Sequence, residues 1–171
     1  RAQMVIDLGQ QGQVAYFKGD LPRATRLFGQ GLTEAMRIED SEGVGVMSIN
    51  LARISRESGD SARALNILDA VSAWHRGNLA IRTRQEMDLL AAVLLSDLAQ
   101  RDEALGRLQA LREQCAATCE IAIGIDSLQA RLLLEKGEHL GIYHIGTTEE
   151  ISIETVAREV GRYFGRNIVV V

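Results

Sequence analysis

The sequence predicts an all-α fold, an α-solenoid of stacked antiparallel helical hairpins, that ends in a short C-terminal β-α-β tail. The main observation is a pattern that recurs every forty residues, in which a small residue is followed four positions later by a large apolar one. Such a period is typical of hairpins that bury their faces against their neighbours. The single proline in 171 residues also favours long helices, because proline interrupts a helix interior. The paired positions are Ala24 and Phe28, Ala64 and Leu68, and Ala104 and Leu108.

The turns inside the hairpins have a recognisable chemistry. Gly19-Asp20 and Gly59-Asp60 each stand between two apolar-periodic segments. Glycine ends a helix readily in the left-handed conformation, and aspartate caps the helix that follows. Pro22 suits the first turn of its helix, where amides have no intrahelical acceptor. The third turn, before Ala104, lacks a glycine.

Apolar residues at three- and four-residue steps predict helices over about 2–18, 21–35, 44–58 and 61–75, a third repeat over 79–114, and a further first helix over about 118–136. Gly12 is expected to permit close packing against Ala24. Trp74 is expected in the core or as a lid on a hairpin, with stacking on a ligand as the alternative. The predicted inner faces also include Met4, Val5, Leu8, Ala15, Leu27, Leu32, Ala35, Val46, Ile49, Ala52, Ile54, Leu65, Val71, Met87, Leu90, Ala92, Leu94, Leu95, Leu105 and Leu111.

Composition excludes several classes of protein. A net charge of −4 offers no general attraction for nucleic acid or an anionic membrane. No stretch is long and apolar enough to span a bilayer. Cys115 and Cys119 stand four apart on one helical face, which fits a shared metal or joint oxidation, but we expect two small packed residues in a reducing, cytoplasmic setting.

The periodicity changes after about residue 138. Residues 139–171 read as strand, turn, capped helix and strand, with Ser152 as the cap. A lone β-α-β unit cannot bury its faces or pair its strand edges. We therefore expect the tail to be a truncated domain, to pack on the last helix, or to pair with another copy in a homodimer.

The hairpins resemble tetratricopeptide repeats with a period of about forty residues, over 1–138 and about three and a half hairpins. The resemblance rests on small first-helix residues (Gly12, Ala52, Ala92, Ala130) that recur in register with the small second-helix residues and the Gly-Asp turns. The segment 31–68 looks most like the sensor and scaffold arms of large bacterial transcriptional activators. This resemblance implies a protein-binding scaffold that belongs to a larger bacterial regulatory protein.

The tail is similar to the C-terminal segment of NAD-dependent sugar-nucleotide epimerases and dehydratases. The similar residues are Tyr143-His144-Ile145-Gly146 and the stretch from Ser152 to Ala157, with His144 in place of the usual Asn. The dinucleotide fingerprint and the Tyr–Lys catalytic pair of that family are missing from this sequence. The alternative hypothesis is thus a fragment of such an enzyme with an appended repeat domain.

The tetratricopeptide resemblance implies a ligand groove along the first helices. Among its residues, Arg53 and Arg56 lie on one helical face and, with Arg131, have the chemistry to grip a carboxylate or a phosphorylated peptide. The alternative is solvated arginine paired with Glu57 or Asp60. The expected groove consists of Gln13, Tyr16, Ile49, Arg53, Arg56, Leu89, Val93, Ser96, Ser127 and Arg131.

No catalytic constellation, cofactor motif or set of metal ligands stands out in the sequence, because its three histidines are scattered and no serine stands in a nucleophile elbow. The sequence therefore predicts a non-catalytic scaffold that binds a protein or peptide partner and needs no cofactor.

Overall fold

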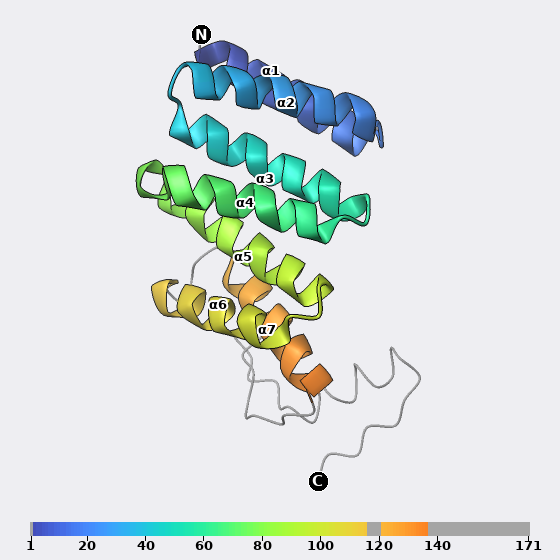
Figure 1. Cartoon of the computed structure of the whole chain (residues 1–171), viewed down its shortest axis with the longest axis vertical. Coiled ribbons are helices and arrows are strands. Elements are labelled where there is room, and N and C mark those ends of the chain that lie inside the picture. Colours follow the sequence, from blue (N-terminus) through green and yellow to red (C-terminus); the bar gives the residue numbers. More distant parts are fainter. Residues whose placement is uncertain (1, 116–120, 137–171) are drawn as a thin grey trace. The chain divides into compact units, whose positions relative to one another are not determined.

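The computed structural model describes residues 2–115 and 121–136 (Figure 1). The chain divides into two compact units, residues 1–107 and 108–171, and each is described by itself. The predicted tail over 139–171 lies outside the described residues, so the expected strands stay a prediction.

The described residues are helical and contain no strand, which confirms the all-α class for this part of the chain. Helices in equivalent places begin and end close to forty residues apart. The elements are α1 (Ala2–Phe17), α2 (Leu21–Arg37), α3 (Ser41–Glu57), α4 (Ser61–His75), the 3-10 turn η1 (Arg76–Asn78), α5 (Ile81–Asp97), α6 (Arg101–Gln114) and α7 (Ala122–Lys136).

Four turns share one geometry and recur on a twenty-residue register. The backbone has a positive φ at Gly19, Glu39, Gly59 and Ala99 (76°, 58°, 82° and 60°). At each turn this residue donates to the carbonyl three positions back, and the next residue donates to the carbonyl five positions back. This is the hydrogen-bond pattern of a Schellman motif, which satisfies the last carbonyls of a helix.

The caps predicted at Asp20 and Asp60 are confirmed, and one more is present at Asp40. Asp20 and Asp60 accept hydrogen bonds from the backbone N–H groups of Arg23 and Arg63, at 3.1 and 2.9 Å. Asp40 caps α3 in the same way. Aspartate is a favoured residue at this position because its carboxylate satisfies an amide that has no intrahelical acceptor.

The turn series is interrupted once, between α4 and α5. Here η1 replaces the Schellman turn, and Leu79 is extended (φ −82°, ψ 146°). Arg76 of η1 donates to both carboxylate oxygens of Asp88 on α5, at 2.9 and 2.7 Å. These hydrogen bonds raise the pKa of Arg76. The predicted end of the helix at about residue 75 is confirmed, since α4 ends at His75.

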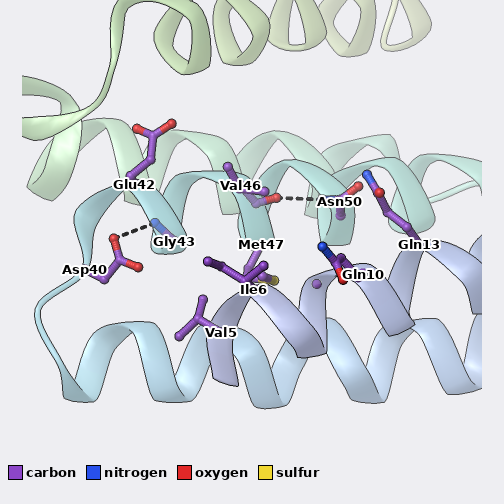
Figure 2. A pocket seen from close by; sticks show the side chains of 11 residues that line it. Val5, Ile6, Gln10, Gln13, Asp40, Glu42, Gly43, Val46, Met47 and Asn50 are labelled. Atoms are coloured by element: carbon purple, nitrogen blue, oxygen red, sulfur yellow. Dashed lines mark hydrogen bonds between the residues drawn. The ribbon is translucent and has the colours of Figure 1, made fainter. Parts of the chain in front are cut away.

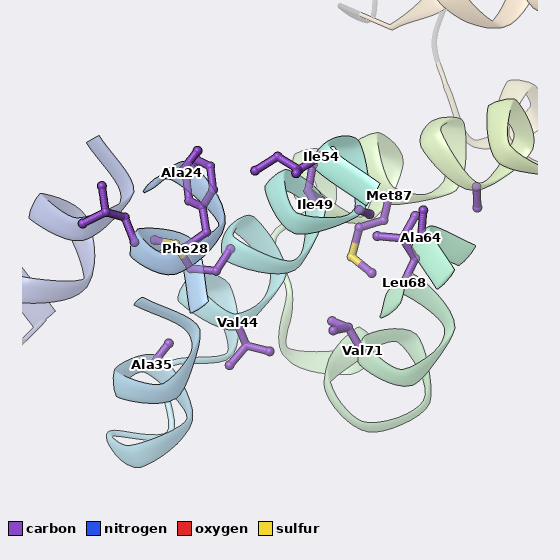
Figure 3. Close-up of a cluster of buried hydrophobic side chains, with 14 of the residues drawn as sticks. Ala24, Phe28, Ala35, Val44, Ile49, Ile54, Ala64, Leu68, Val71 and Met87 are labelled. Atoms are coloured by element: carbon purple, nitrogen blue, oxygen red, sulfur yellow. The ribbon is translucent and has the colours of Figure 1, made fainter. Parts of the chain in front are cut away.

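The core of the first unit follows the predicted inner faces, and Figure 3 shows its central part. Each helix from α1 to α5 contacts the next along the chain. Ala24, Ala64 and Ala104 are completely buried, and Phe28 and Leu68 are 1% exposed. These small and large residues let neighbouring helices approach closely and interlock, as the forty-residue pattern predicts.

Glycines create several of these close contacts. A Cβ added at Gly12 would lie 2.6 Å from the ring of Phe28, so the close packing expected at Gly12 is present, with Phe28 as the neighbour. Met47 is 3% exposed. Its side chain passes where a Cβ at Gly9 or at Gly31 would stand, at 2.7 and 2.9 Å.

Four residues differ from the predictions about buried side chains and free thiols. Trp74 is 83% exposed on α4 and is not part of the core. Met4 and Val46 are also exposed, because each lies outside the stripe of α1 or α3 that packs inward. Cys115 is buried as expected, but it is disulfide-bonded and not a free thiol.

In the second unit, the end of α6 and α7 carry buried side chains, with Leu108, Ile125 and Leu132 completely buried. Arg112 of α6 and Asp126 of α7 form an ion pair of 3.1 Å.

Candidate partner-binding surface

Helices α1, α3 and α5 lie beside one another, since α3 contacts both α1 and α5. Residues forty apart therefore occupy equivalent places on successive helices. We call the surface on which α1, α3 and α5 adjoin the first-helix face. Its two junctions, α1–α3 and α3–α5, are built from equivalent positions.

Two ion pairs connect α3 and α5 across their junction. Arg53 of α3 donates to Glu86 of α5. Arg56 donates to both carboxylate oxygens of Asp97, at 2.5 and 3.3 Å, and this hydrogen bonding raises the pKa of Arg56. Both arginines thus bind acidic partners on the neighbouring helix, and neither pairs with the Glu57 or Asp60 weighed from sequence.

A carboxylate also connects the other end of the same junction. Glu42 of α3 accepts a hydrogen bond from the backbone N–H of Ala80 at 2.9 Å and another from the hydroxyl of Thr83. The N-cap residue of α5, Ala80, has no side chain that could cap the helix. Glu42 therefore satisfies a backbone amide at the start of α5 from the neighbouring helix.

The α1–α3 junction has one comparable contact. The hydroxyl of Tyr16 donates to Glu57, and this hydrogen bond, together with partial burial, raises the pKa of Tyr16. Tyr16 and Glu57 stand forty residues before Arg56 and Asp97, so the two pairs are equivalent.

Beyond that contact, the α1–α3 junction holds a pocket of about 370 Å³ (Figure 2). In Figure 2, Asp40 and Glu42 lie at one end, Gln13 and Asn50 lie at the other, and Ile6 and Met47 lie between them. The pocket is lined by Val5, Ile6, Gly9, Gln10, Gln13, Asp40, Glu42, Gly43, Val46, Met47 and Asn50.

The position of the pocket follows from a change of side chains at equivalent places. Gln13 and Val46 stand forty residues before Arg53 and Glu86. A carboxamide and an isopropyl group cannot form an ion pair, so nothing links the two helices where Arg53 and Glu86 link the next two. The pair Arg53–Glu86 covers this space at the α3–α5 junction, whereas the equivalent space at the α1–α3 junction is open.

The predicted groove residues lie in five different environments. Gln13 lines the pocket, and Tyr16, Arg53 and Arg56 form the contacts described above. Leu89, Val93 and Ser96 are half-buried on α5. Ile49 is 2% exposed and belongs to the core, because its side of α3 packs inward. Ser127 and Arg131 are exposed on α7 in the second unit, where Arg131 lies 3.9 Å from Glu135.

Sequence reasoning missed most of the pocket. The sequence pattern does not single out Ile6, Gln10, Met47 or Asn50, and it predicts Val46 as a core residue. A usable signal exists: Ile6 and Val46 are forty residues apart, and both are apolar and exposed (51% and 38%). The forty-residue spacing of these two apolar residues is the part of the signal that the sequence contains, and the structure adds that both are exposed.

No protein-family model matches the chain, and no match was found among curated proteins. Among the residues that the structure describes, no helix has both the length and the apolar character that crossing a bilayer requires. Within 2–115 and 121–136, no group of three or more His, Cys, Asp or Glu side chains is arranged to hold a metal ion.

Proposed function

We propose that the chain is a non-catalytic interaction scaffold that binds a partner protein or peptide on its first-helix face. We further propose that its hairpins continue as a right-handed α-solenoid of the tetratricopeptide kind. The repeated Schellman turns and the buried Ala24, Ala64 and Ala104 support this architecture. A place in a larger bacterial regulatory protein of the cytoplasm rests on the resemblance of residues 31–68 alone.

One observation carries the proposed binding role. The pocket of about 370 Å³ lies between two first helices and combines exposed apolar side chains with carboxamides and carboxylates. Ligand sites in proteins are commonly concave, largely apolar and equipped with a few polar groups that fix orientation. The pocket reaches the lower end of the usual size range for such sites, which suits a short segment of a partner.

A selection of random peptides displayed on phage tests this proposal, with the whole chain as bait. Ile6→Ser should weaken binding of the selected peptides at least about tenfold, since it removes an apolar wall of the pocket. Met36→Ser is the matched control, because Met36 is an equally exposed apolar residue (54% against 51%) on the second helix α2. Equal losses for the two variants, or no enrichment of peptides, would overturn the proposal.

A further inference from the structure

One side of α1 is exposed, although the equivalent sides of α3 and α5 are buried. Met4 and Val14 are 47% and 54% exposed, whereas their equivalents on α3, Val44 and Ile54, are 0% and 6% exposed. Helices α3 and α5 each pack against the helix before them, α2 or α4, while α1 and α2 form the outermost hairpin of the first unit (Figure 1). We call the exposed side the outer seam of α1, and its residues are Met4, Asp7, Gln11, Val14 and Lys18.

The outer seam has the spacing by which two helices pair along their length. Its residues follow one another at alternating steps of three and four, which keeps them on one helix face. Lys18 comes directly after α1, and its N–H donates to the carbonyl of Val14 at 3.2 Å, so it continues the helical spacing. The seam is therefore suited to contact with one further helix.

Two charges on the outer seam restrict which helix can cover it. Asp7 stands at the place of Met47 and Met87, which are 3% and 1% exposed. It accepts a hydrogen bond from Nε2 of Gln3 at 2.8 Å, and in the described part of the chain neither Asp7 nor Lys18 forms an ion pair. Burying a charge is costly unless it is paired. A covering helix must therefore present a cation opposite Asp7 and, about 16 Å further along, an anion opposite Lys18.

A second copy of α1 in antiparallel orientation presents both charges at the required places. Along the helix, the midpoint between Asp7 and Lys18 is also the midpoint between Gln11 and Val14. When two copies pair about a two-fold axis at this midpoint, Asp7 of each copy lies opposite Lys18 of the other. Gln11 of each copy likewise lies opposite Val14 of the other. Two identical ion pairs then flank a centre of amide and isopropyl groups.

A cavity beside the seam offers space for a side chain of the second copy. It has a volume of about 330 Å³ and is lined by residues that include Val14, Lys18 and, from the start of α2, Arg23. In the antiparallel register, Met4 of the second copy lies opposite Leu21, close to this end of the cavity. Methionine is unbranched and flexible, so it fills irregular spaces of this kind well.

We infer that two copies of the chain associate through the outer seams of α1, paired in antiparallel register. The polar Asp7 and Gln11 fix this register at a cost in stability, and a contact between two helices is smaller than the interface of a permanent dimer. We therefore expect a reversible dimer. None of the seam residues lines the α1–α3 pocket, so this surface is additional to the proposed binding site.

Sedimentation equilibrium of the whole chain over a range of concentrations tests this inference. The wild type should show a monomer–dimer equilibrium that weakens as salt rises. Asp7→Lys and Lys18→Glu each place like charges opposite one another, so each should weaken dimerisation at least about tenfold. Arg26→Glu is the control for Lys18→Glu, because it changes the charge equally at an exposed residue of α2 outside the seam. It should leave the equilibrium unchanged, and circular dichroism checks that all variants stay helical.

Mixing the two single variants gives the most specific result. The Asp7→Lys chain has only cations on its seam and the Lys18→Glu chain only anions, so an equimolar mixture should form heterodimers at least as tightly as the wild type dimerises. Both substitutions in one chain exchange the two charges and should restore the affinity of the wild type.

Three outcomes would overturn the inference. The first is a wild type that stays monomeric at its highest soluble concentration. The second is single variants that dimerise as the wild type does, because the copies would then meet through another surface. The third is a mixture of the single variants that stays monomeric. The proposed function is judged separately, by the comparison of Ile6→Ser with Met36→Ser.

Discussion

The junctions α1–α3 and α3–α5 use equivalent positions of a forty-residue repeat, yet different side chains fill them. At α3–α5, Arg53 pairs with Glu86 and Arg56 with Asp97. At α1–α3, Tyr16 and Glu57 reproduce the second contact, while Gln13 and Val46 leave a pocket at the place of the first. The helices repeat at both junctions, but α3 follows a Schellman turn whereas α5 follows η1, so the difference lies in this connection and in a few surface residues.

This comparison shows which positions of the repeat maintain the helix arrangement and which can vary. Buried alanines and Schellman turns recur along the described helices and maintain their spacing. The solvent-facing positions between first helices are free to vary, because exposed ion pairs contribute little to stability. A change such as Gln13 for Arg, or Val46 for Glu, therefore opens a pocket at a small energetic cost.

The largest expected difference between the junctions is in the loss of stability when a glycine is replaced by alanine. A Cβ at Gly45 would lie 2.8 Å from Leu79 and 2.9 Å from the Cγ2 of Thr83, whereas a Cβ at Gly9 meets the end of the Met47 side chain. Thr83 is β-branched and hydrogen-bonded to Glu42, but Met47 is unbranched and flexible. Gly45→Ala should lower the free energy of unfolding by about 1–3 kcal/mol, and Gly9→Ala should change it by less than about 1 kcal/mol.

Urea denaturation measures both values. Gly29→Ala is the control for helix propensity, because an added Cβ there meets nothing within 4 Å. It should stabilise the protein by up to about 1 kcal/mol. If Gly9→Ala proves as harmful as Gly45→Ala, the α1–α3 junction is as rigidly packed as its neighbour.

The next largest effect is the coupling energy between Arg53 and Glu86, which form an ion pair across the α3–α5 junction. In a double-mutant cycle of Arg53→Gln and Glu86→Val, the coupling energy should be about 0.2–1 kcal/mol and favourable, since both side chains are about 40% exposed. Near 1 M salt it should fall toward zero. A coupling energy of zero at low salt would mean that the pair does not close the junction.

The smallest effect is a pH dependence at Tyr16. Its pKa is raised in the folded chain by the hydrogen bond to Glu57, so the neutral phenol is favoured by folding. This contribution is fully present below the ordinary tyrosine pKa of about 10 and is lost as pH rises through the folded pKa. Tyr16→Phe should cost about 0.5 kcal/mol at pH 7.

The difference in stability between the wild type and Tyr16→Phe should disappear in strongly alkaline solution. Urea denaturation of both proteins across the alkaline range measures it. A difference that stays constant through the ionisation of tyrosine would exclude the hydrogen bond as its source.

Sequence reasoning predicts the helices and the left-handed residue of two of the four turns, because these depend on local signals such as Gly19-Asp20 and Gly59-Asp60. It did not predict the positive φ at Glu39 or Ala99, where no glycine marks the left-handed residue. In these turns the packing of flanking helices and the repeated hydrogen bonds stabilise a conformation that the residue itself disfavours.

The pocket could be predicted only in part. Gln13 was found by its place in the repeat, but Val46 was read as core, because an apolar residue at helical spacing suits either side of an amphipathic stripe. The partners of Arg53 and Arg56 lie 33 and 41 residues away, so their pairing depends on which helices adjoin. The residues of a single helix do not show which other helix lies beside it.

The most direct test of the central claim is to close the pocket with the charged pair of the neighbouring junction. The double variant Gln13→Arg with Val46→Glu places an arginine and a glutamate at the positions equivalent to Arg53 and Glu86. Isothermal titration with a phage-selected peptide should show binding at least about tenfold weaker than in the wild type, with an unchanged or higher melting temperature. Unchanged peptide affinity in a folded double variant would contradict the account, because the partner would then bind elsewhere.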